Sequence, residues 1–365
     1  MRVVFGSHTN LGSQFKVGSY HLSREMAKIG VQTLHIGKPV TPFHLFSRDK
    51  KNSLLRLSCA KKGVFQVSEN LFECVPLFLH KYCSEKSGPL FEPGVHHLRR
   101  LLLRNKFDSA DVVFIDEHSF FWLPKLINAK KWIYRPTDNI RDGEPASCAK
   151  LILEFADGVV CTSRPLLEQV KGMSNRDFPS VVIANGVDIE HFSERKGYPE
   201  EYHCTHKKRV VYVGSLDERF NWSDLEYLAH FRPDWGIYVI GPVLDALPVM
   251  PSNVFVLGAR DYSEIPKYLQ YADVGILPML HSKQNNSRSP MKLYEYLASG
   301  LQVLATRTAE LERRCEEGVF LYSDKVELRR AVDQLEGVHP KGANLNIHSW
   351  SNKARQLLDF VSTLP

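Results

Sequence analysis

The sequence lacks the marks of several large protein classes. No segment approaches the roughly 18 uninterrupted apolar residues that a membrane-spanning helix needs. The first residues, MRVVFGSHTN, contain neither the apolar core nor the small-residue cleavage site of a signal peptide. The 7 cysteines are odd in number, scattered and never spaced Cys-x-x-Cys, which argues against a disulfide framework and against a zinc ribbon. We therefore expect reduced thiols and a cytoplasmic protein.

The glycine motifs of two common nucleotide-binding classes are absent as well. Residues 6–19, GSHTNLGSQFKVGS, follow a strand-like segment but contain no Gly-Lys-Ser or Gly-Lys-Thr and do not fit Gly-x-Gly-x-x-Gly. This weakens the assignment to P-loop NTPases and to dinucleotide-dependent oxidoreductases. The cluster His203-Cys204-x-His206 looks like metal ligands but has no second ligand pair, so we expect no metal ion and no cofactor.

Short β-branched runs alternate with helix-like stretches in two successive series, which predicts two parallel sheets with helical crossovers. The length of 365 residues suits two domains, and the apolar and charged shares of 43% and 24% are those of a folded chain. A polar segment with Gly and Pro separates the two series and indicates a linker. We expect an N-terminal domain at residues 1–188, a linker at 189–208, a second domain at 209–345 and a C-terminal helix at 346–365 that crosses back to the first domain.

The expected strands are the apolar runs of the two series. Those of the first series are Val3–Phe5, Val31–Ile36, Val112–Ile115, Trp132–Tyr134, Gly158–Thr162 and Val181–Ala184. Those of the second are Val210–Val213, Gly236–Ile240, Val254–Leu257, Val274–Leu277, Gln302–Ala305 and Val319–Tyr322.

Positive charge is concentrated in residues 48–106, which contain twelve Lys or Arg and five Asp or Glu. The net positive charge of this segment exceeds the net charge of +6 of the whole chain. Apolar side chains lie in or beside this segment: Phe43, Leu45, Phe46, Phe65, Phe78 and Phe91. A basic face mixed with apolar residues can bind an anionic membrane surface, which would make the protein peripheral to the membrane. The alternative is a solvated basic face over ordinary core aromatics. Nucleic acid is not expected as a partner.

Three segments of the first half follow expected strands, and ligands of parallel sheets bind beyond the strand C-termini. Residues 6–19 offer backbone N–H groups to an anion or a sugar, the alternative being a plain strand-to-helix turn. Residues 116–118 are Asp-Glu-His. Residues 134–138, Tyr-Arg-Pro-Thr-Asp, end in Asp138, whose carboxylate could act as a general base or simply cap a helix. The candidate acceptor contacts are His8, Asn10, Gly12, Lys16, His118 and Arg135.

Two segments of the second half suit a phosphate. In VVYVGSLDER (210–219), Gly214 allows close approach of the backbone, and Arg219 could supply charge. In SRSPMKLYEYLASG (287–300), Pro290 suits the first turn of a helix and Ser289 can cap it. Lys292 and Glu295 then share one face, where the helix N-terminus and the lysine favour a diphosphate and the carboxylate can accept ribose hydroxyls. The alternative is an ordinary surface ion pair.

Residues 289–306, SPMKLYEYLASGLQVLAT, resemble the nucleotide-sugar loop and helix of GT-B glycosyltransferases in the broad family-4-like group. The likeness continues in the expected order through the second half: NGVD (185–188), VVYVGSLDERFNW (210–222), YVIGPV (238–243), NVFVLGARDYSEIPKYLQYADVGILPM (253–279) and HSWSNKARQLL (348–358). The first half matches less well. Tyr-Arg-x-x-Asp at 134–138 and Ser-x-Met-Lys at 289–292 are also similar to the xanthan-pathway glucuronosyltransferase, an inverting GT-B enzyme.

The resemblance implies an α/β protein of the GT-B fold, with two Rossmann-like doubly wound parallel-sheet domains facing each other across a cleft. It implies a metal-independent transfer of a hexosyl or glycuronosyl group from a nucleoside-diphosphate sugar, UDP-linked in the first place, to a hydroxyl of a glycan or lipid-linked acceptor in surface polysaccharide synthesis. Asp138 would be the base of an inverting reaction. The implied nucleotide-sugar contacts are Gly214, Ser215, Arg219, Arg260, Ser289, Met291, Lys292 and Glu295.

One position departs from the pattern. Many retaining members carry two glutamates eight positions apart, and Ser287 stands where the first would be if Glu295 is the second. This argues against a retaining mechanism. It also leaves open a catalytically inactive GT-B-like scaffold or nucleotide-sugar binding subunit, and, as a third reading, a hydrolase or epimerase.

Overall fold

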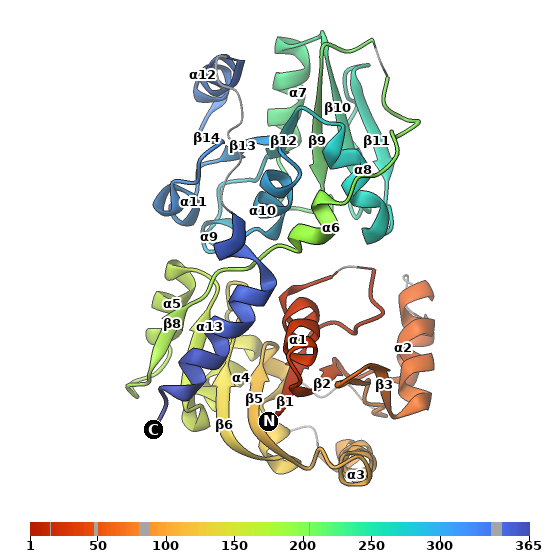
Figure 1. The fold of residues 1–365 in the computed structure, drawn as a ribbon, viewed down its shortest axis with the longest axis vertical. Coiled ribbons are helices and arrows are strands. Elements are labelled where there is room, and N and C mark those ends of the chain that lie inside the picture. Colours follow the sequence, from red (N-terminus) through yellow and green to blue (C-terminus); the bar gives the residue numbers. More distant parts are fainter. Residues whose placement is uncertain (15, 47–49, 80–87, 204, 337–344) are drawn as a thin grey trace. The chain divides into compact units, whose positions relative to one another are not determined.

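The computed structural model describes residues 1–14, 16–46, 50–79, 88–203, 205–336 and 345–365. The chain forms two compact units, one of Met1–Ala184 with Trp350–Pro365 and one of Asn185–Ser349 (Figure 1). Each unit holds a largely or wholly parallel β-sheet with helical connections. The expected α/β fold class with two parallel-sheet domains is confirmed.

The sheet of the first unit has the strand order β3-β4-β2-β1-β5-β6-β7-β8. Its strands are β1 (Arg2–Ser7), β2 (Gln32–Gly37), β3 (Val64–Ser68), β4 (Leu71–Cys74), β5 (Ser109–Ile115), β6 (Asn128–Tyr134), β7 (Gly158–Cys161) and β8 (Ser180–Val182). Every expected strand of the first series is present. The pairs are parallel except β3 with β4, which form an antiparallel hairpin at the edge of the sheet.

The hairpin β3–β4 was not expected from the sequence. Its outer strand β3 is half-buried to exposed along its whole length, so it carries none of the buried apolar run that marks the inner strands. The turn depends on Asn70, which adopts the left-handed conformation at φ 58°. The inner strands differ because both of their faces are covered: Val3, Val4 and Phe5 of β1 are all fully buried.

The helices of the first unit connect these strands. They are α1 (Gly18–Lys28), η1 (Pro42–Phe46), α2 (Lys50–Lys62), α3 (Gly88–Arg104), η2 (His118–Phe120), η3 (Leu123–Lys125), α4 (Glu144–Phe155), α5 (Arg164–Lys171) and α13 (Trp350–Ser362). The C-terminal helix α13 belongs to this unit and packs on α1, where Trp350 stacks on His21 with ring centroids 5.0 Å apart.

The sheet of the second unit has the order β11-β10-β9-β12-β13-β14, and all its pairs are parallel. Its strands are β9 (Lys208–Val213), β10 (Trp235–Ile240), β11 (Val254–Gly258), β12 (Val274–Leu277), β13 (Gln302–Thr306) and β14 (Val319–Tyr322), which confirms the second expected series. Its helices are α6 (Ile189–Ser193), α7 (Trp222–Phe231), η4 (Tyr262–Glu264), α8 (Ile265–Gln270), α9 (Lys283–Asn286), α10 (Met291–Ala298), α11 (Ala309–Arg314), α12 (Lys325–Glu336) and η5 (Leu345–His348).

Residues 189–208, expected as a linker, are part of the second unit instead. They contain α6, and Phe192 and Tyr202 lie buried in the core of that unit beside Tyr238. The sequence misled because these two aromatic anchors are embedded in an otherwise polar segment. The first unit accordingly ends at Ala184 rather than at residue 188.

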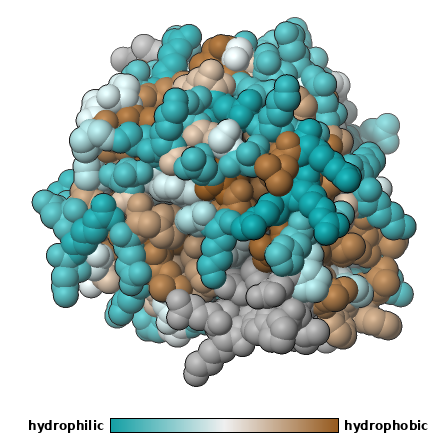
Figure 2. All heavy atoms as spheres, turned by 90° about the horizontal axis from the view of Figure 1, so that it is seen from below, coloured by the Kyte–Doolittle hydropathy of each residue, from teal (hydrophilic) through white to brown (hydrophobic). Residues whose placement is uncertain are grey.

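The surface is mixed in polarity. On the face shown in Figure 2, hydrophobic side chains lie in several patches between hydrophilic ones. Among the residues that the structure describes, no helix combines the length and the apolar character needed to cross a bilayer.

Candidate functional site

The order of strands in the second sheet reverses between β9 and β12. The chain moves outward from β9 through β10 to β11, then returns to pair β12 on the other side of β9. Such a reversal leaves a crevice beyond the strand ends, where ligands of doubly wound sheets bind. Helix α10 reaches this carboxyl-terminal edge of the sheet, because Tyr296 accepts a hydrogen bond from the backbone N–H of Val213 at 2.7 Å through its hydroxyl oxygen.

Gly214, the residue after β9, is a point of close approach. A Cβ at this position would overlap Cε of Lys292 and would lie 2.8 Å from the hydroxyl of Tyr212. A second glycine, Gly241 after β10, comes so near that an added Cβ would overlap the carbonyl of Gly214. Only glycine therefore fits at position 214 while Lys292 keeps its place, in line with the close backbone approach expected at this residue.

Near this edge of the sheet, Glu295 is buried and Lys292 is half-buried. Neither the Lys292 ammonium nor the Glu295 carboxylate makes a hydrogen bond or ion pair within the described part of the chain, although Lys292 Nζ lies 5.8 Å from the Tyr212 ring centroid. Burial lowers the pKa of Lys292, and nearby Arg288 lowers it further, against an opposing effect of Glu295. Burial raises the pKa of Glu295, against an opposing effect of Lys292. Two costly groups are thus held without a protein partner, as a ligand site requires.

Further cations surround Lys292. Arg219 donates to both carboxylate oxygens of Asp217, with Nε to Oδ1 at 2.8 Å. Burial alone would raise the pKa of Asp217, but the bonds from Arg219 outweigh it and lower the pKa. Arg288, half-buried in the loop before α10, acts electrostatically on Lys292, Asp217 and Tyr212 alike. Three cations and two carboxylates therefore gather here, an excess of positive charge suited to an anion.

The start of α10 has no side-chain cap. Pro290 occupies the N-cap position and provides no side-chain cap hydrogen bond. The expectation that Ser289 caps this helix is wrong, because its hydroxyl oxygen accepts from the Asn185 backbone N–H at 3.1 Å and from Arg314 Nη2 at 2.8 Å. Those two bonds use both lone pairs of the hydroxyl. Ser289 therefore does not occupy the first N–H groups of α10, which are the kind of donors that bind a phosphate.

Other contacts fix the loop before α10. The side-chain nitrogen Nδ2 of Asn185 donates to the Ser289 carbonyl at 2.8 Å, and Arg314 also donates to the hydroxyl of Tyr294 at 3.0 Å. Arg314 is itself held by the buried carboxylate of Glu310 at 2.8 Å. The loop is therefore rigidly placed without help from a ligand.

Arg260 and Ser215 occupy less direct places. The Arg260 guanidinium donates to Glu201 at 3.0 Å, to the Tyr268 hydroxyl at 3.1 Å and to the Leu257 carbonyl at 2.7 Å. These three contacts hold Arg260 beside β11 and α8, and its expected part in framing the nucleotide stays a prediction. The carbonyl of Ser215 accepts from the Tyr212 hydroxyl at 3.0 Å, which fixes the turn after Gly214.

In the first unit, the reversal of strand order lies between β1 and β5, and charged side chains gather at their carboxyl ends. Lys38, just after β2, lies 3.6 Å from Glu117 Oε2, and His118 Nε2 lies 3.4 Å from Glu117 Oε1. Burial alone would raise the pKa of Glu117, but Lys38, His118 and nearby His8 outweigh it and lower the pKa. Two of the expected acceptor residues, His8 and His118, are thus brought into one cluster.

Arg135 does not face a ligand. Its guanidinium forms a bidentate pair with Asp116, in which Nε donates to Oδ1 at 2.9 Å, and both side chains are buried. The expectation that it contacts an acceptor is therefore wrong as a direct contact. The pair ties the carboxyl ends of β5 and β6 together, three residues before the exposed Asp138.

The loop after β1 is partly committed to internal contacts. Lys16 Nζ donates to the Leu11 carbonyl at 2.7 Å and lies 4.5 Å from the Tyr20 ring centroid, and burial lowers its pKa. Asn10 is buried, with its backbone carbonyl accepting from Ser13 at 3.0 Å. Gly12 is exposed. Of these expected acceptor residues, Gly12 is therefore the most accessible.

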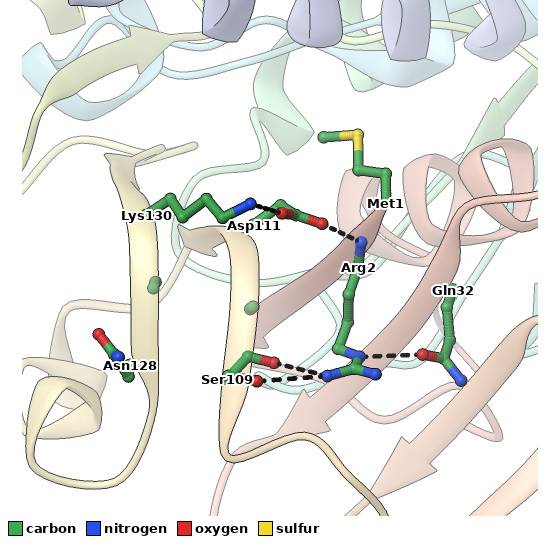
Figure 3. Close-up of a pocket in the computed structure, with 9 residues that line it drawn as sticks. Met1, Arg2, Gln32, Ser109, Asp111, Asn128 and Lys130 are labelled. Carbon is green, nitrogen blue, oxygen red and sulfur yellow. Dashed lines mark hydrogen bonds and ion pairs between the residues drawn. The ribbon is translucent and has the colours of Figure 1, made fainter.

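A recess of about 450 Å³ lies at the opposite, amino-terminal edge of the first sheet (Figure 3). Its lining residues are Met1, Arg2, Gln32, Ser109, Ala110, Asp111, Asn128, Ala129 and Lys130. Arg2 donates to Gln32 at 2.9 Å and to the Ser109 carbonyl at 3.2 Å, while Lys130 pairs with Asp111 at 2.7 Å. These cations are matched by acceptors within the recess, and the edge is the wrong one for a ligand of a parallel sheet.

Comparison with known families decides what the second unit is. Residues 207–336 match the family described as "Glycosyl transferases group 1". This unit is a group 1 glycosyltransferase domain. A protein of Bacillus subtilis (strain 168) named as a teichuronic acid biosynthesis glycosyltransferase, TuaH, is 27% identical over 199 residues. That match covers 52% of this chain and 47% of TuaH, so the similarity spans about half the length of the curated relative.

Solved structures extend the likeness to both units, and the fold is GT-B. Sucrose-phosphate synthase from Thermosynechococcus elongatus superposes with a TM-score of 0.67 at 16% identity, covering 100% of this chain and 94% of that one. HepE from Anabaena, solved with UDP-glucose, gives a TM-score of 0.68 at 14% identity, with 100% of both chains covered.

The group 1 domain contains site residues that sequence reasoning missed. Arg288 stands inside the quoted segment 287–300, but nothing in the helical spacing singled it out because it precedes the helix. Asp217 and Asn185 lie in the quoted phrases and act through Arg219 and Ser289 respectively. In the first unit, Lys38 was missed because it is a single lysine after a strand, with no motif around it. Among the described residues, no three His, Cys, Asp or Glu side chains gather as metal ligands would, and Cys204 lies outside those residues.

Proposed function

We propose that this protein transfers a sugar from a nucleoside-diphosphate sugar, UDP-linked in the first place, to a hydroxyl of a glycan or lipid-linked acceptor in surface polysaccharide synthesis. The observation that carries the proposal is the pair of the half-buried Lys292 and the buried Glu295 beside Gly214, whose charged groups make no hydrogen bond or ion pair within the described part of the chain. A diphosphate would pair with Lys292 and with the uncapped N-terminus of α10, at Met291. Glu295 would accept the ribose hydroxyls.

The chemistry follows from these charges. As the glycosidic bond to the diphosphate breaks, negative charge develops on the leaving oxygen, and Lys292, Arg288 and the helix dipole stabilise it. Protein cations thus take the part that a metal ion plays in other transferases, which supports a metal-independent reaction. Asp138 would take the proton of the attacking hydroxyl, and attack from the face opposite the diphosphate would invert the anomeric carbon.

The relatives support the donor and the pathway. HepE is described in complex with UDP-glucose, and TuaH is named for teichuronic acid biosynthesis. Together with the candidate site, these two names favour a UDP-sugar as donor and a surface polymer as acceptor. The position of Ser287, where retaining relatives carry a glutamate, supports inversion.

The test is thermal stabilisation by UDP, GDP, ADP, CMP and a set of UDP-sugars. We expect UDP to raise the Tm of the wild type and to have no effect on Lys292→Met. Lys283→Met is the matched control, because Lys283 is exposed on α9 of the same unit, and it should respond as the wild type does. The most strongly stabilising UDP-sugar is then incubated with candidate acceptors, and the product configuration is read by NMR.

The outcomes separate the alternatives. If no nucleotide stabilises a protein shown to be folded, the transferase proposal fails. If UDP-sugars bind but no acceptor is ever glycosylated, the inactive scaffold or binding subunit is favoured. If UDP is released at the full rate without an acceptor, the protein is a hydrolase.

A further inference from the structure

Helix η1 exposes an apolar sequence almost completely. Its residues Pro-Phe-His-Leu-Phe (42–46) include no buried side chain, and Phe46, Phe43 and Leu45 are 87%, 66% and 52% exposed. Single exposed apolar residues are ordinary, but two phenylalanines and a leucine within four positions are not. Its contacts with the rest of the unit therefore leave most of its apolar surface exposed.

Helix α2, which packs beside η1, continues the pattern. It turns small residues inward, with Ser53, Cys59 and Ala60 buried, and turns Leu54 and Leu55 outward. A helix selected only for packing on its own unit would show the reverse arrangement. Leu77 and Leu79 are exposed as well, in the strand-like segment that pairs with Val40 just before η1. We call these residues of η1, α2 and the segment at Leu77 the apolar lip.

The charge on helix α2 is of one sign. Lys50, Lys61 and Lys62 are exposed at the two ends of α2, and the helix contains no Asp or Glu, although Asp49 and Glu69 stand nearby in the sequence. Aromatic and leucine side chains flanked by lysines are the composition of protein segments that lie in the headgroup region of anionic bilayers. A soluble partner protein would need matching acidic groups around an apolar cavity, whereas an anionic bilayer supplies both properties everywhere.

The apolar lip adjoins the loop that follows β1. A Cβ at Gly12 would lie 3.4 Å from Cδ2 of Leu55, so the most accessible of the expected acceptor residues is in contact distance of α2. An acceptor whose lipid tail remained in a bilayer under the lip would present its polar end next to this loop.

We propose that the apolar lip binds the surface of an anionic membrane, inserting Phe43 and Phe46 at the headgroup level, and that the acceptor is lipid-linked. The second clause rests on the proposed transferase function, whereas the first does not. The proposal is supported by the exposure of the apolar side chains, by the positive charge of α2 and by the contact of Leu55 with the loop at Gly12.

The experiment is co-sedimentation of the full chain with vesicles. Vesicles of phosphatidylglycerol and phosphatidylcholine (30:70) are compared with vesicles of phosphatidylcholine alone, at low and high salt. The test variant is Phe43→Ser with Phe46→Ser. The matched control is Leu247→Ser with Val249→Ser, since these exposed apolar residues belong to the second unit and are not part of the lip. A second variant, Lys61→Glu with Lys62→Glu, tests the charge without touching the apolar side chains.

We expect the wild type and the control to bind the anionic vesicles and to bind phosphatidylcholine at least tenfold more weakly. The partition coefficient of the double serine variant onto anionic vesicles should be about tenfold or more lower, because each substitution removes an aromatic ring from the membrane interface. The charge variant should lose roughly fivefold or more for each lysine reversed, and salt should weaken the wild type in the same direction.

Three results would overturn the proposal: no binding of the wild type to anionic vesicles, equal binding by the serine variant, or equal losses in the test and control variants. A dimeric wild type whose serine variant is monomeric but binds vesicles unchanged would show that a second copy covers the lip instead. Lys292→Met should bind vesicles normally. If the wild type binds vesicles but not UDP, only the proposed transferase function is contradicted. If it binds UDP but not anionic vesicles, only the proposed membrane binding by the apolar lip is contradicted.

Discussion

The affinity for UDP should depend on pH through Lys292. Burial lowers the pKa of this lysine to about 8 in the free protein, with Arg288 acting in the same direction. A bound diphosphate stabilises the charged form and raises the pKa, so binding takes up a proton above pH 8. By linkage, affinity is at its full value below the free pKa and falls as the pH rises through it.

The size of the effect follows from the fraction of charged lysine. With a free pKa of about 8, roughly one lysine in ten remains charged at pH 9, so the Kd for UDP should rise about tenfold between pH 7 and pH 9. Burial also raises the pKa of Glu295, to about 7, and this predicts weaker ribose binding on the acid side. The alkaline limb is the cleaner one, because a terminal phosphate itself titrates near pH 6 or so.

The assay is isothermal titration with UDP from pH 6.5 to 9.5. Lys292→Arg keeps its charge over the whole range, so its Kd should be nearly independent of pH above 7. Lys292→Met should bind weakly at every pH and show no alkaline slope. Lys283→Met should retain the slope of the wild type. A wild-type Kd that stays constant to pH 9.5, or a slope that persists in Lys292→Met, would refute the reasoning.

Three further substitutions test other parts of the molecule. Asp138→Asn should lower kcat by about 10²- to 10⁴-fold, measured by UDP release in the presence of acceptor, and leave the Kd for UDP unchanged. Gly214→Ala should displace Lys292, abolish stabilisation by UDP and lower the free energy of unfolding by about 1–3 kcal/mol in urea titration, whereas Gly197→Ala, with nothing near its added Cβ, should not. Arg135→Met should leave the buried Asp116 unpaired and cost about 3–5 kcal/mol in the same titration. An Arg135→Met variant as stable as the wild type would contradict a structural role for that pair.

Most of the fold could be predicted because the inner strands are buried on both faces. Runs such as Val3–Phe5 and Val274–Leu277 have no polar face, so they stand out without any alignment. Segments without such a continuous apolar run were not predicted correctly. The edge strand β3 has half-buried and exposed residues only, and Phe192 and Tyr202 are single anchors in a polar segment.

The site was predictable to the extent that it depends on chain order. Gly214 and Lys292 follow from the rule that ligands bind beyond strand ends and at helix N-termini, and the structure brings them into contact. Arg135 shows the limit. Its place after a strand favours a ligand contact, and only the spatial neighbour Asp116, 19 positions earlier, reveals that the charge is already matched.

Ser289 bears on the proposed anion site at the start of α10. A serine before a helix usually caps it, and the missing cap costs the free protein about 1 kcal/mol. Here Asn185 and Arg314 take both lone pairs of the hydroxyl, and the same bonds hold the loop in place before any ligand arrives. The desolvated charge of Lys292 adds a second cost, one helical turn or less away. A diphosphate would relieve both at once, whereas filling the helix end with a capping side chain would relieve only the first and block the ligand. The missing helix cap and the desolvated lysine are two unfavourable features at the same helix end, and a single anionic group would compensate for both. We therefore propose that the leaving diphosphate binds at this end of α10.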